Sequence, residues 1–480
     1  MSSLNVQKLS TSFTLLSLFA TAFILGCARS FNPDIERGSS YKYRVGYPEV
    51  RLSAIGLLDA EDQPLINVAA DIVYGSLIYK ELDGKLQSKF SVDIQILDKS
   101  DNDELVKSDR YNLSIEKEDP NITHSQDVFI FQRQISVEPG EYQINVTVTD
   151  QNSRKQTTRI SHTFIPDPGN EISNLTSIQM LGKDLDSDPD AWIPITTYDV
   201  QGKVDSLKFI FQVTNNRSDQ PMTIDTKLIR YRSDSSVARS MYFTNYSQSS
   251  LPYKGIEYDE SEVIQSNRRV LTQPGSVLIE FLFPQQERGN YRFEVTTTET
   301  EEESIFKARD FSVKSTNYPS LKNPIELARP LAYLMDDKEY ERLLAIKNPD
   351  SMKAEIDRFW LKNIRDKNKA KSVIQMYYER VEEANKQFSN FKEGWKTDTG
   401  MVYILFGPPW YVEEHLDLMR WSYSYNRSDP DFNYTFEQTK LRSEFYPFEN
   451  YILQRQQRYF TIQYQQVQLW LTGQILTRSI

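Results

Sequence analysis

The sequence predicts a multidomain protein, with two β-sandwich modules of immunoglobulin-like character followed by an α+β domain. Three observations support this fold class. Between residues 43 and 313, apolar side chains alternate with polar ones, as in Phe90–Ile96, and this period of two is typical of strands with one face in water. Beyond residue 325 the apolar spacing becomes that of helices. Proline-containing breaks at 166–170 and 318–324 separate the three parts.

These breaks set the expected boundaries. The expected parts are a signal peptide at 1–26, a lipidated tether at 27–42, module 1 at 43–167, module 2 at 171–316 and a C-terminal α+β domain at 325–480. A short pattern, Gly-x-Tyr at the start of a strand, occurs in 139–146 and again in 288–295. This faint internal repeat indicates two modules of the same type, although the Cys…Trp…Cys pattern of true immunoglobulin domains is missing.

Composition limits the classes of function. The 480 residues carry a formal net charge of −11, which disfavours nucleic-acid binding, because that depends on clustered lysine and arginine. A single cysteine excludes a disulfide within the chain. Three histidines leave little for a histidine-based metal or nucleophile site. We therefore expect no cofactor other than a covalently attached lipid.

The first 27 residues have the pattern of a bacterial secretion signal. The apolar stretch 13–25 is shorter than the roughly 20 residues that span a bilayer, and it ends in Ile24-Leu25-Gly26 before Cys27. This arrangement resembles the signal of bacterial lipoproteins. The resemblance implies cleavage before Cys27, diacylglycerol on its sulfur and an acyl chain on its new amino group. An ordinary signal or anchor with an incidental cysteine is the alternative.

The residues that follow Cys27 bear on location. The next residue is Ala28 rather than aspartate, so the inner-membrane retention signal of lipoproteins is absent, and no acidic run follows. We expect a lipid anchor in the outer membrane, with the periplasmic face favoured over the cell surface.

Helices are expected first in the C-terminal domain, and strands after them. Apolar residues at helical spacing predict helices over 352–364 and 374–388. The run Met401–Phe406 is continuously apolar, as expected of a strand that is covered on both faces. Alternation predicts a last strand over Phe460–Leu471. Helices followed by strands indicate helices packed on one face of a sheet.

One motif is distinctive. It begins Gly394-Trp395-Lys396-Thr397-Asp398 and continues through Thr399 and Gly400 into the apolar run and then Gly407-Pro408-Pro409. Together with Phe359-Trp360, Arg380-Val381, Ala384-Asn385 and Phe388, it resembles the GWxTD domain of lipoproteins and secreted proteins from Bacteroidetes and related bacteria. The resemblance covers about residues 325–480. The chain departs from the usual family pattern at Thr399 and Trp410, where arginine and aspartate are usual.

The residue types in this motif favour a structural role. Gly394 can adopt the left-handed conformation that closes a helix, and Trp395 would fold back on the last helical turn. Thr397 and Asp398 can accept backbone N–H groups in a tight turn before the strand.

Gly407, Pro408 and Pro409 would end the strand, since proline cannot continue a ladder.

The alternative to a structural role of the motif makes Asp398 a catalytic acid or base, with His415 as its candidate partner.

A run of alternating aspartates is a weak candidate for a metal site. Alternate positions in 184–190 are carboxylates that could bind Ca²⁺, namely Asp184, Asp186, Asp188 and Asp190. The glycine and glutamate that an EF-hand loop requires are replaced by Pro189 and Ile195, so a solvated acidic turn is favoured.

The sequence therefore favours a non-enzymatic envelope lipoprotein that serves as an interaction or scaffold subunit of an outer-membrane complex. The two modules would be spacers or docking surfaces, and the C-terminal domain would bind an envelope protein partner. A glycan-binding or glycan-processing protein is the alternative, because five of the six tryptophans lie in the C-terminal domain and aromatic rings can stack on sugars. A periplasmic hydrolase has no support beyond Asp398 and His415.

Overall fold

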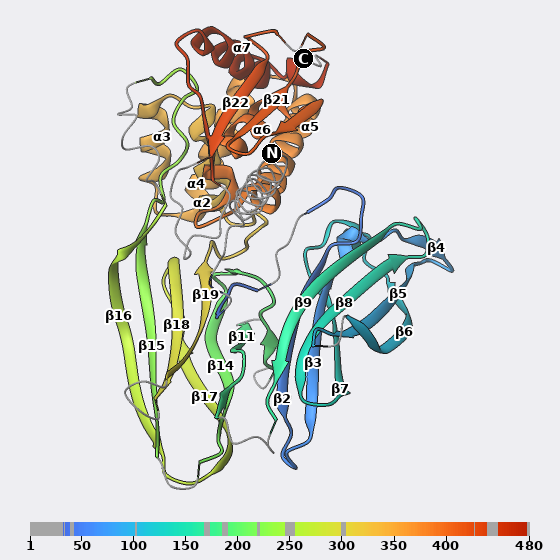
Figure 1. Ribbon diagram of the computed structural model, residues 1–480. Helices are drawn as coiled ribbons and strands as arrows, with labels where there is room; N and C mark the ends of the chain where they lie inside the picture. Colours follow the sequence, from blue (N-terminus) through green and yellow to red (C-terminus); the bar gives the residue numbers. More distant parts are fainter. Residues whose placement is uncertain are drawn as a thin grey trace, which may run out of the picture.

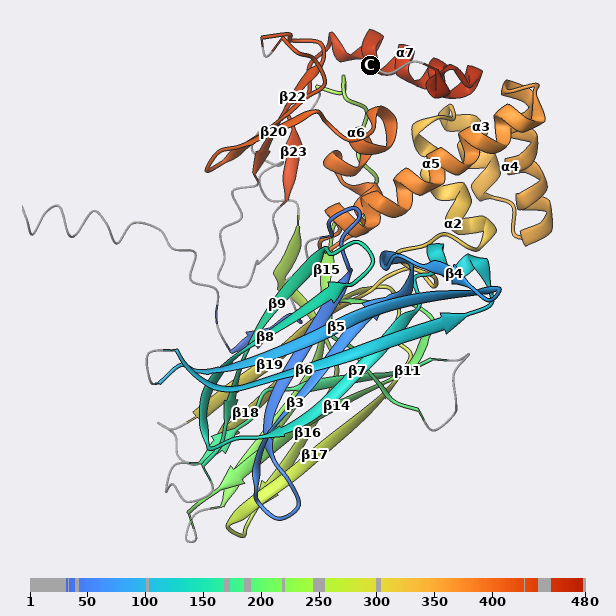
Figure 2. The ribbon, with the colours of Figure 1, turned by 90° about the vertical axis from the view of Figure 1, so that its right-hand side faces the viewer.

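The computed structural model describes residues 32, 34–38, 43–100, 103–167, 173–184, 191–217, 221–244, 255–298, 304–426, 428–438 and 450–477. Cys27 lies outside these residues. The described chain is multidomain, with β-rich sheets in its N-terminal part and an α+β region at its C-terminal end (Figure 1). The two sheet modules lie side by side, and the C-terminal helices lie across one end of them (Figures 1 and 2).

Module 1 has two sheets around one apolar core, to which both sheets contribute. The first sheet has the order β2-β3-β7, with strands β2 (Val50–Leu58), β3 (Pro64–Val73) and β7 (Val128–Ser136). The second has the order β4-β5-β8-β9 with β6 also paired to β5, and its strands are β4 (Lys80–Leu82), β5 (Lys85–Asp98), β6 (Glu104–Lys117), β8 (Gly140–Asp150) and β9 (Gln156–Ile165). Short 3₁₀ turns are η1 (Tyr74–Ser76) and η2 (Pro120–His124). The alternation predicted in β5 is confirmed, since Val92, Ile94 and Ile96 are buried and Gln95 is exposed.

Module 2 has the same two-sheet plan around a phenylalanine-rich core. One sheet has the order β1-β19-β18-β15-β16 with β13 on β19, and its strands are β1 (Ile35–Glu36), β13 (Asp199–Val200), β15 (Met222–Ser233), β16 (Ile256–Leu271), β18 (Gly289–Thr298) and β19 (Ser304–Val313). The other contains β10 (Asn174–Leu175), β11 (Gln179–Asp184), β12 (Ile193–Pro194), β14 (Val204–Asn215) and β17 (Gly275–Pro284). Strand β1 precedes module 1 in the chain yet pairs in parallel with β19. Part of the segment expected to be a tether therefore belongs to the sheet of module 2.

The Gly-x-Tyr repeat has a structural counterpart. Gly140 begins β8 and Gly289 begins β18. In module 1 the Tyr142 hydroxyl donates to the Glu138 carbonyl at 2.8 Å, and in module 2 the Tyr291 hydroxyl donates to the Glu287 carbonyl at 2.8 Å. The same hydrogen bond, over the same spacing, holds the turn before an inner strand in both modules.

The two modules contact each other through buried polar groups. The side-chain amide of Gln212 accepts from the Leu58 N–H at 2.7 Å and donates to the Leu58 carbonyl at 3.1 Å. The Thr196 hydroxyl donates to Asp71 at 2.8 Å. Burial raises the pKa of Asp71 to about 6, against the opposing effects of Arg51 and Thr196. Because unpaired buried polar groups are costly, the hydrogen bonds of Gln212 with Leu58 and of Thr196 with Asp71 favour one fixed arrangement of the modules over two independently moving units.

The C-terminal domain packs helices against a small antiparallel sheet. Its helical elements are α2 (Pro324–Ala328), η4 (Arg329–Tyr333), α3 (Asp337–Leu344), α4 (Pro349–Asn363), α5 (Lys367–Phe388), η5 (Gly394–Lys396), α6 (Asp398–Phe406), α7 (Tyr459–Thr472) and η6 (Gln474–Leu476). The sheet has the order β20-β21-β22-β23, with strands β20 (Tyr411–Glu414), β21 (Leu418–Ser422), β22 (Asn433–Gln438) and β23 (Tyr451–Leu453). Met241, from the connection between β15 and β16, is fully buried in this core. Module 2 thus supplies part of the C-terminal core.

Two strand predictions in this domain are wrong. Met401–Phe406 lies in helix α6, and Phe460–Leu471 lies in helix α7. Every residue from 399 to 406 is buried, so the apolar run carries no periodicity that could distinguish a helix from a strand. Helix α7 buries Gln463 and Gln466 beside its apolar residues, which hides the helical period in the sequence.

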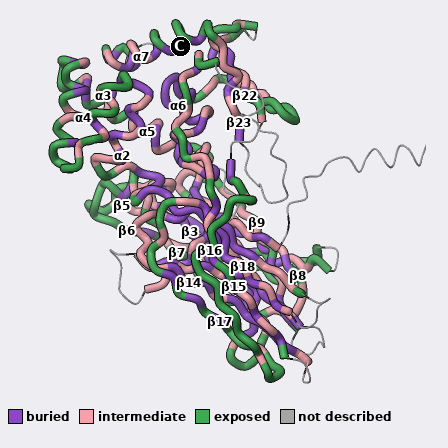
Figure 3. Tube along the Cα trace, turned by 90° about the vertical axis from the view of Figure 1, so that its left-hand side faces the viewer, coloured by how far each residue is buried: buried purple, intermediate pink, exposed green. Residues whose placement is uncertain are grey.

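The C-terminal domain is more deeply buried than the edge strand β16 of module 2 (Figure 3). The C-terminal core is continuous, whereas most of β16 is exposed along its length. Among the described residues, no helix is both long and apolar enough to cross a membrane.

Candidate functional site at the domain junction

The two glycines of the motif are required by close backbone contacts. A Cβ atom on Gly394 would lie 1.9 Å from the Ala384 carbonyl oxygen, and one on Gly400 would lie 2.0 Å from the Gly394 carbonyl oxygen. Gly394 is not among the described glycines with positive φ, so its predicted left-handed conformation is wrong. The motif instead lets η5 pass against the end of α5 and lets α6 begin against η5.

Trp395 and Thr397 fix this crossing. Trp395 is buried, its backbone N–H donates to Asn385 on α5 at 3.2 Å, and its carbonyl accepts from the Tyr333 hydroxyl at 2.6 Å. These contacts place Trp395 against the last turn of α5, as the sequence predicted. The Thr397 hydroxyl accepts from the Gly400 N–H at 3.0 Å and donates to the Gly394 carbonyl at 2.7 Å. Thr397 therefore caps the N-terminus of α6, so the turn that it stabilises precedes a helix.

Glu393, which the sequence reasoning missed, is the central acid of the junction. Its carboxylate is 3% exposed and accepts from Arg288, from the Ser315 N–H at 3.0 Å and from the Trp395 indole N–H at 3.0 Å. Lys396 lies 3.3 Å from it. Burial alone would raise the pKa of Glu393, but Lys396, Arg288 and the Ser315 N–H lower it to about 2. The sequence does contain a signal that could have identified this residue, because Glu393 directly precedes the motif and lies between Lys392 and Lys396.

Asp398 forms a second buried ion pair. Its carboxylate binds the Arg455 guanidinium through both oxygens, at 2.6 and 2.7 Å, and accepts from the Leu453 N–H at 2.8 Å. Arg455 also donates to the carbonyls of Arg239 at 2.9 Å and Ser240 at 3.1 Å. Asp398 thus orients the arginine that holds the β15–β16 connection of module 2 in the C-terminal domain.

The structure does not bring the proposed acid–base pair together. Among the described residues, no hydrogen bond or ion pair joins Asp398 to His415. The His415 backbone N–H donates to the Leu418 carbonyl at 2.7 Å, in the turn between β20 and β21. The Asp398 carboxylate is instead occupied by Arg455 and Leu453.

Gly407 ends an element, as predicted, but that element is helix α6. It has φ of +88°, which favours glycine, and it is the C-terminal cap of the helix. The nearby Leu405 carbonyl accepts from Gln466 at 2.6 Å and from the Trp470 indole at 3.0 Å. Pro408 and Pro409 lie between α6 and β20, where they prevent the helix from continuing.

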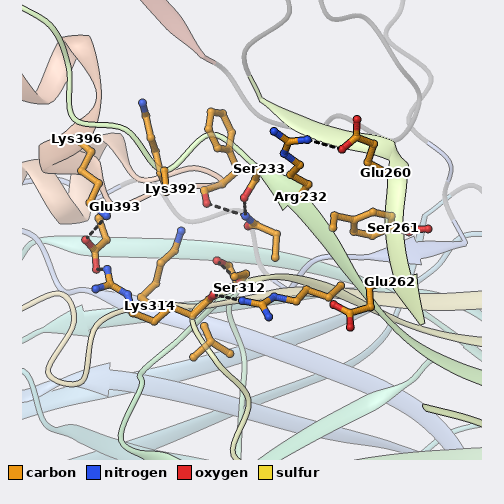
Figure 4. Close-up of a pocket in the computed structure, with 18 of the residues that line it drawn as sticks. Arg232, Ser233, Glu260, Ser261, Glu262, Ser312, Lys314, Lys392, Glu393 and Lys396 are labelled. Atoms are coloured by element: carbon orange, nitrogen blue, oxygen red, sulfur yellow. Dashed lines mark hydrogen bonds and ion pairs between the residues drawn. The ribbon is translucent and has the colours of Figure 1, made fainter. Parts of the chain in front are cut away.

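A polar cleft of about 760 Å³ opens beside Glu393. One wall is the outer face of β15, β16, β18 and β19, and the other is formed by residues 391–396 together with Arg329. Figure 4 shows Glu393 between Lys314 and Lys396, with Arg232 and Glu260 paired to each other on the β15–β16 wall of the cleft. Burial lowers the pKa of the Lys314 ammonium, and Asp199 and Glu393 oppose that shift.

The family comparison agrees with the motif. Residues 289–472 match the GWxTD domain family. This chain contains a GWxTD domain. The match begins at the first residue of β18, earlier than the expected boundary at 325, and it therefore includes the two strands, β18 and β19, next to which the motif lies.

Contacts of Asn290 in β18 fit this extension of the GWxTD domain. Its amide donates to the Phe391 carbonyl at 3.0 Å, and its side-chain oxygen accepts from the Tyr198 hydroxyl at 2.7 Å. Lys314, directly after β19, donates to the Asn390 carbonyl at 2.6 Å. The GWxTD domain and the last strands of module 2 thus share one hydrogen-bonded boundary.

Comparisons with other proteins do not indicate a function for the GWxTD domain. No curated protein matches the chain. Similar solved structures include a red sea bream transglutaminase (8% identity, TM-score 0.18, 55% of this chain and 31% of that one) and dimeric latent PorU from Porphyromonas gingivalis (11%, 0.21, 56% and 21%). A mutant of Salmonella alpha-2-macroglobulin is similar at 16% identity with a TM-score of 0.18, over 58% of this chain and 17% of that one. The chain spans less than a third of the length of each of these proteins.

The remaining candidates are only partly described. Asp186, Asp188 and Asp190 lie outside the described residues, and Asp184 is placed only as the last residue of β11. Within the described ranges, no three His, Cys, Asp or Glu side chains are grouped to hold a metal ion. Trp395 and Trp421 are buried, whereas Trp410 is exposed and lies 4.4 Å from the exposed Tyr425 ring, centroid to centroid.

Proposed function

We propose that this protein is a non-enzymatic lipoprotein of the Bacteroidetes type and a scaffold subunit of an outer-membrane complex. Its anchor would be diacylglycerol and an N-acyl chain on Cys27, with the protein on the periplasmic face. The signal sequence and the GWxTD domain support this proposal. The matched tyrosine hydrogen bonds of the two modules support their assignment as immunoglobulin-like β-sandwiches.

The observation that carries the scaffold proposal is the exposed edge of the GWxTD sheet. Strand β20 is the first in the order β20-β21-β22-β23, so within the described residues one of its edges is not paired. Tyr411 and Val412 on β20 are exposed, as are the neighbouring Trp410, Leu416 and Leu418. Exposed apolar edges usually mark interaction sites, since natural proteins otherwise protect them.

The proposed occupant is an extended segment of an envelope protein that adds a strand to β20. The His415 N–H bonds to Leu418, so alternate residues 411 and 413 also face β21, and the N–H and carbonyl groups of Val412 and Glu414 point outward. The Glu414 carboxylate is exposed next to Val412. A segment that alternates apolar and basic side chains would complement this edge.

Two substitutions at one position test this strand addition. Val412→Pro removes an outward-facing N–H without touching the ladder to β21, whereas Val412→Thr keeps that N–H. We expect the envelope complex, isolated after mild crosslinking, to be lost in the first variant and retained in the second. Retention in both variants would overturn the proposal.

Site-specific crosslinking supplies a second readout. A photo-crosslinker at Val412 should capture one envelope protein in intact cells. The matched control is Leu282 on β17, which is also exposed and apolar. The same capture from both positions would show only non-specific proximity.

The lipid anchor is tested at Cys27. Cys27→Ser should abolish fatty-acid labelling and cleavage by the lipoprotein peptidase, because a hydroxyl is a far weaker nucleophile than a thiolate. Labelling with a fatty acid and sequencing of the mature N-terminus check this. Equal label in both proteins, or a mature terminus other than position 27, would show that the anchor is misassigned.

Glycan binding is the second candidate. One observation favours it, the exposed pair Trp410 and Tyr425, which could stack on a sugar ring. Trp410→Ala should then weaken binding to isolated envelope glycans, whereas Val412→Pro should not.

A further inference from the structure

The cleft at the domain junction is richer in positive charge than the protein as a whole. The chain carries a formal net charge of −11. Seven basic side chains line the cleft, against three acidic ones. Two of the seven are paired with acidic residues at the outer rim, where Arg232 binds Glu260 and Arg230 binds Glu287 at 2.9 Å. The inner end is arranged differently.

At the inner end, two cations share one carboxylate. Arg288 and Lys396 both bind Glu393. The Glu393 carboxylate also accepts the Ser315 N–H and the Trp395 indole N–H, so its hydrogen-bonding capacity is largely used. Arg288 remains 38% exposed toward solvent. It can therefore offer further N–H groups to a ligand.

Arg329 adds a third cation without a partner. Arg329 lines the cleft, and among the described residues its guanidinium makes neither an ion pair nor a hydrogen bond, while its carbonyl accepts from the Tyr340 hydroxyl at 2.9 Å. Burial lowers the pKa of Lys396, Glu393 opposes this, and the positive charges of Arg288 and Arg329 lower it further. Lys396 thus lies within electrostatic reach of both Arg288 and Arg329, and all three residues line the same cleft.

We propose that this cleft binds a phosphate-bearing small molecule, with the phosphate held between Arg288, Arg329 and Lys396. A dianion there would relieve the repulsion among the three cations, and guanidinium groups bind phosphate oxygens through two parallel hydrogen bonds. The cleft volume of about 760 Å³ exceeds the size of one phosphate group. Ser233, Ser235 and Ser261 also line it and offer hydroxyls to a polar remainder of the ligand.

Calorimetry on the full chain tests the proposal. The probes are inorganic phosphate and pyrophosphate at low ionic strength, where charge interactions are least screened. We expect pyrophosphate to bind, and Arg329→Gln to weaken binding by about tenfold or more, the usual scale for losing one charged hydrogen-bonding partner. Arg329→Gln should leave the fold intact, because its guanidinium supports no described contact. Absence of binding by the wild-type chain would overturn the proposal.

A matched control separates a built site from diffuse attraction. Arg232→Gln removes a charge from the same cleft, but one that is paired with Glu260 and far from Glu393 in Figure 4. Binding should change by less than about twofold in this variant, as expected for an exposed charge pair. Equal losses in both variants, or no loss in Arg329→Gln, would show that no specific site exists.

Two further probes distinguish the two possible sources of the phosphate, a lipid headgroup and a free phosphorylated metabolite. Dihexanoyl phosphatidic acid presents a phosphate monoester on a short, water-soluble lipid. Tighter binding of this probe than of glycerol 3-phosphate would identify a lipid headgroup as the ligand, and the reverse order would identify a free phosphorylated metabolite. Binding of both that is insensitive to Arg329→Gln would contradict the site.

Discussion

At the scale of single residues, Gly394 and Gly400 are constrained by contact with carbonyl oxygens. Neither position has room for a Cβ atom, since the nearest backbone oxygen would lie about 2 Å away. Gly400→Ala should therefore destabilise the protein by ~3 kcal/mol, the upper range for overpacking a tight site. Denaturant unfolding measures the loss. The control is Gly84→Ala, which has free space and pays only for its positive φ, ~1 kcal/mol. Equal losses would contradict the contact argument.

Glu393 makes stability depend on pH. Its pKa falls from the ordinary value of 4.5 to about 2 on folding, through Lys396, Arg288 and Ser315 acting against burial. A lowered pKa means that the carboxylate stabilises the folded protein above pH 4.5 and that this contribution is lost as the pH falls toward 2. Glu393→Gln should cost ~3 kcal/mol at neutral pH, because it leaves buried cations without their partner.

The same substitution should also flatten the acid limb of the stability curve. Urea unfolding at a series of pH values measures both effects. Glu341→Gln, at an exposed position on α3, should leave the curve unchanged. An acid limb in Glu393→Gln as steep as that of the wild type would show that other groups cause it.

At the scale of elements, the sequence identified β5, α4 and α5 because each has one buried face and therefore a clear period. Helix α6 has no exposed face at all, and its cap, Thr397, also suits a turn before a strand. Helix α7 buries Gln463 and Gln466 because they bind backbone groups, Met241 N–H at 2.8 Å and the Leu405 carbonyl at 2.6 Å. A polar residue whose partner is distant in the chain looks like a surface position when only the sequence is read.

Partners that are distant in the chain also limited what the sequence could predict about the site at the domain junction. The motif could be identified by its residues, but the arginine that binds Asp398 is 57 positions away, and the arginine that binds Glu393 is 105 positions away. Sequence spacing does not reveal such pairs without knowledge of the fold. The structural role of the motif could be argued from glycine and proline chemistry, whereas its place between two domains could not.

Helix α6 depends on its cap for a further reason. The Thr397 hydroxyl both accepts from Gly400 and donates to Gly394. Thr397→Ala should cost ~2 kcal/mol, since it removes the cap and leaves the buried Gly400 N–H without its acceptor, while the Gly394 carbonyl keeps the Thr397 N–H at 3.0 Å. Thr397→Ser keeps the hydroxyl and should cost well under half of that. Similar losses in thermal or denaturant unfolding of the two variants would mean that the methyl group, not the hydroxyl, is what matters.

At the scale of the whole molecule, the GWxTD domain is not a separate head on a stalk. Module 2 supplies Met241 to its core, Arg455 holds the backbone of residues 239 and 240, and module 1 reaches it through the ion pair of Glu49 with Lys386 at 3.2 Å. These buried, directional contacts join the three parts of the chain. A fixed arrangement of this kind is what the proposed scaffold role requires.

A fragment comparison tests this integration. Residues 325–480 alone lack Met241, Arg288 and Ser315, so the core has a gap and Glu393 loses two of its partners. We expect this fragment to keep helical far-UV circular dichroism but to lose the near-UV signal of its buried tryptophans, as expected when packing is lost. Residues 173–480 restore all three and should recover the near-UV signal with cooperative unfolding. If the shorter fragment unfolds as cooperatively as the longer one, with the same near-UV spectrum, the contacts across the junction do not stabilise the GWxTD domain.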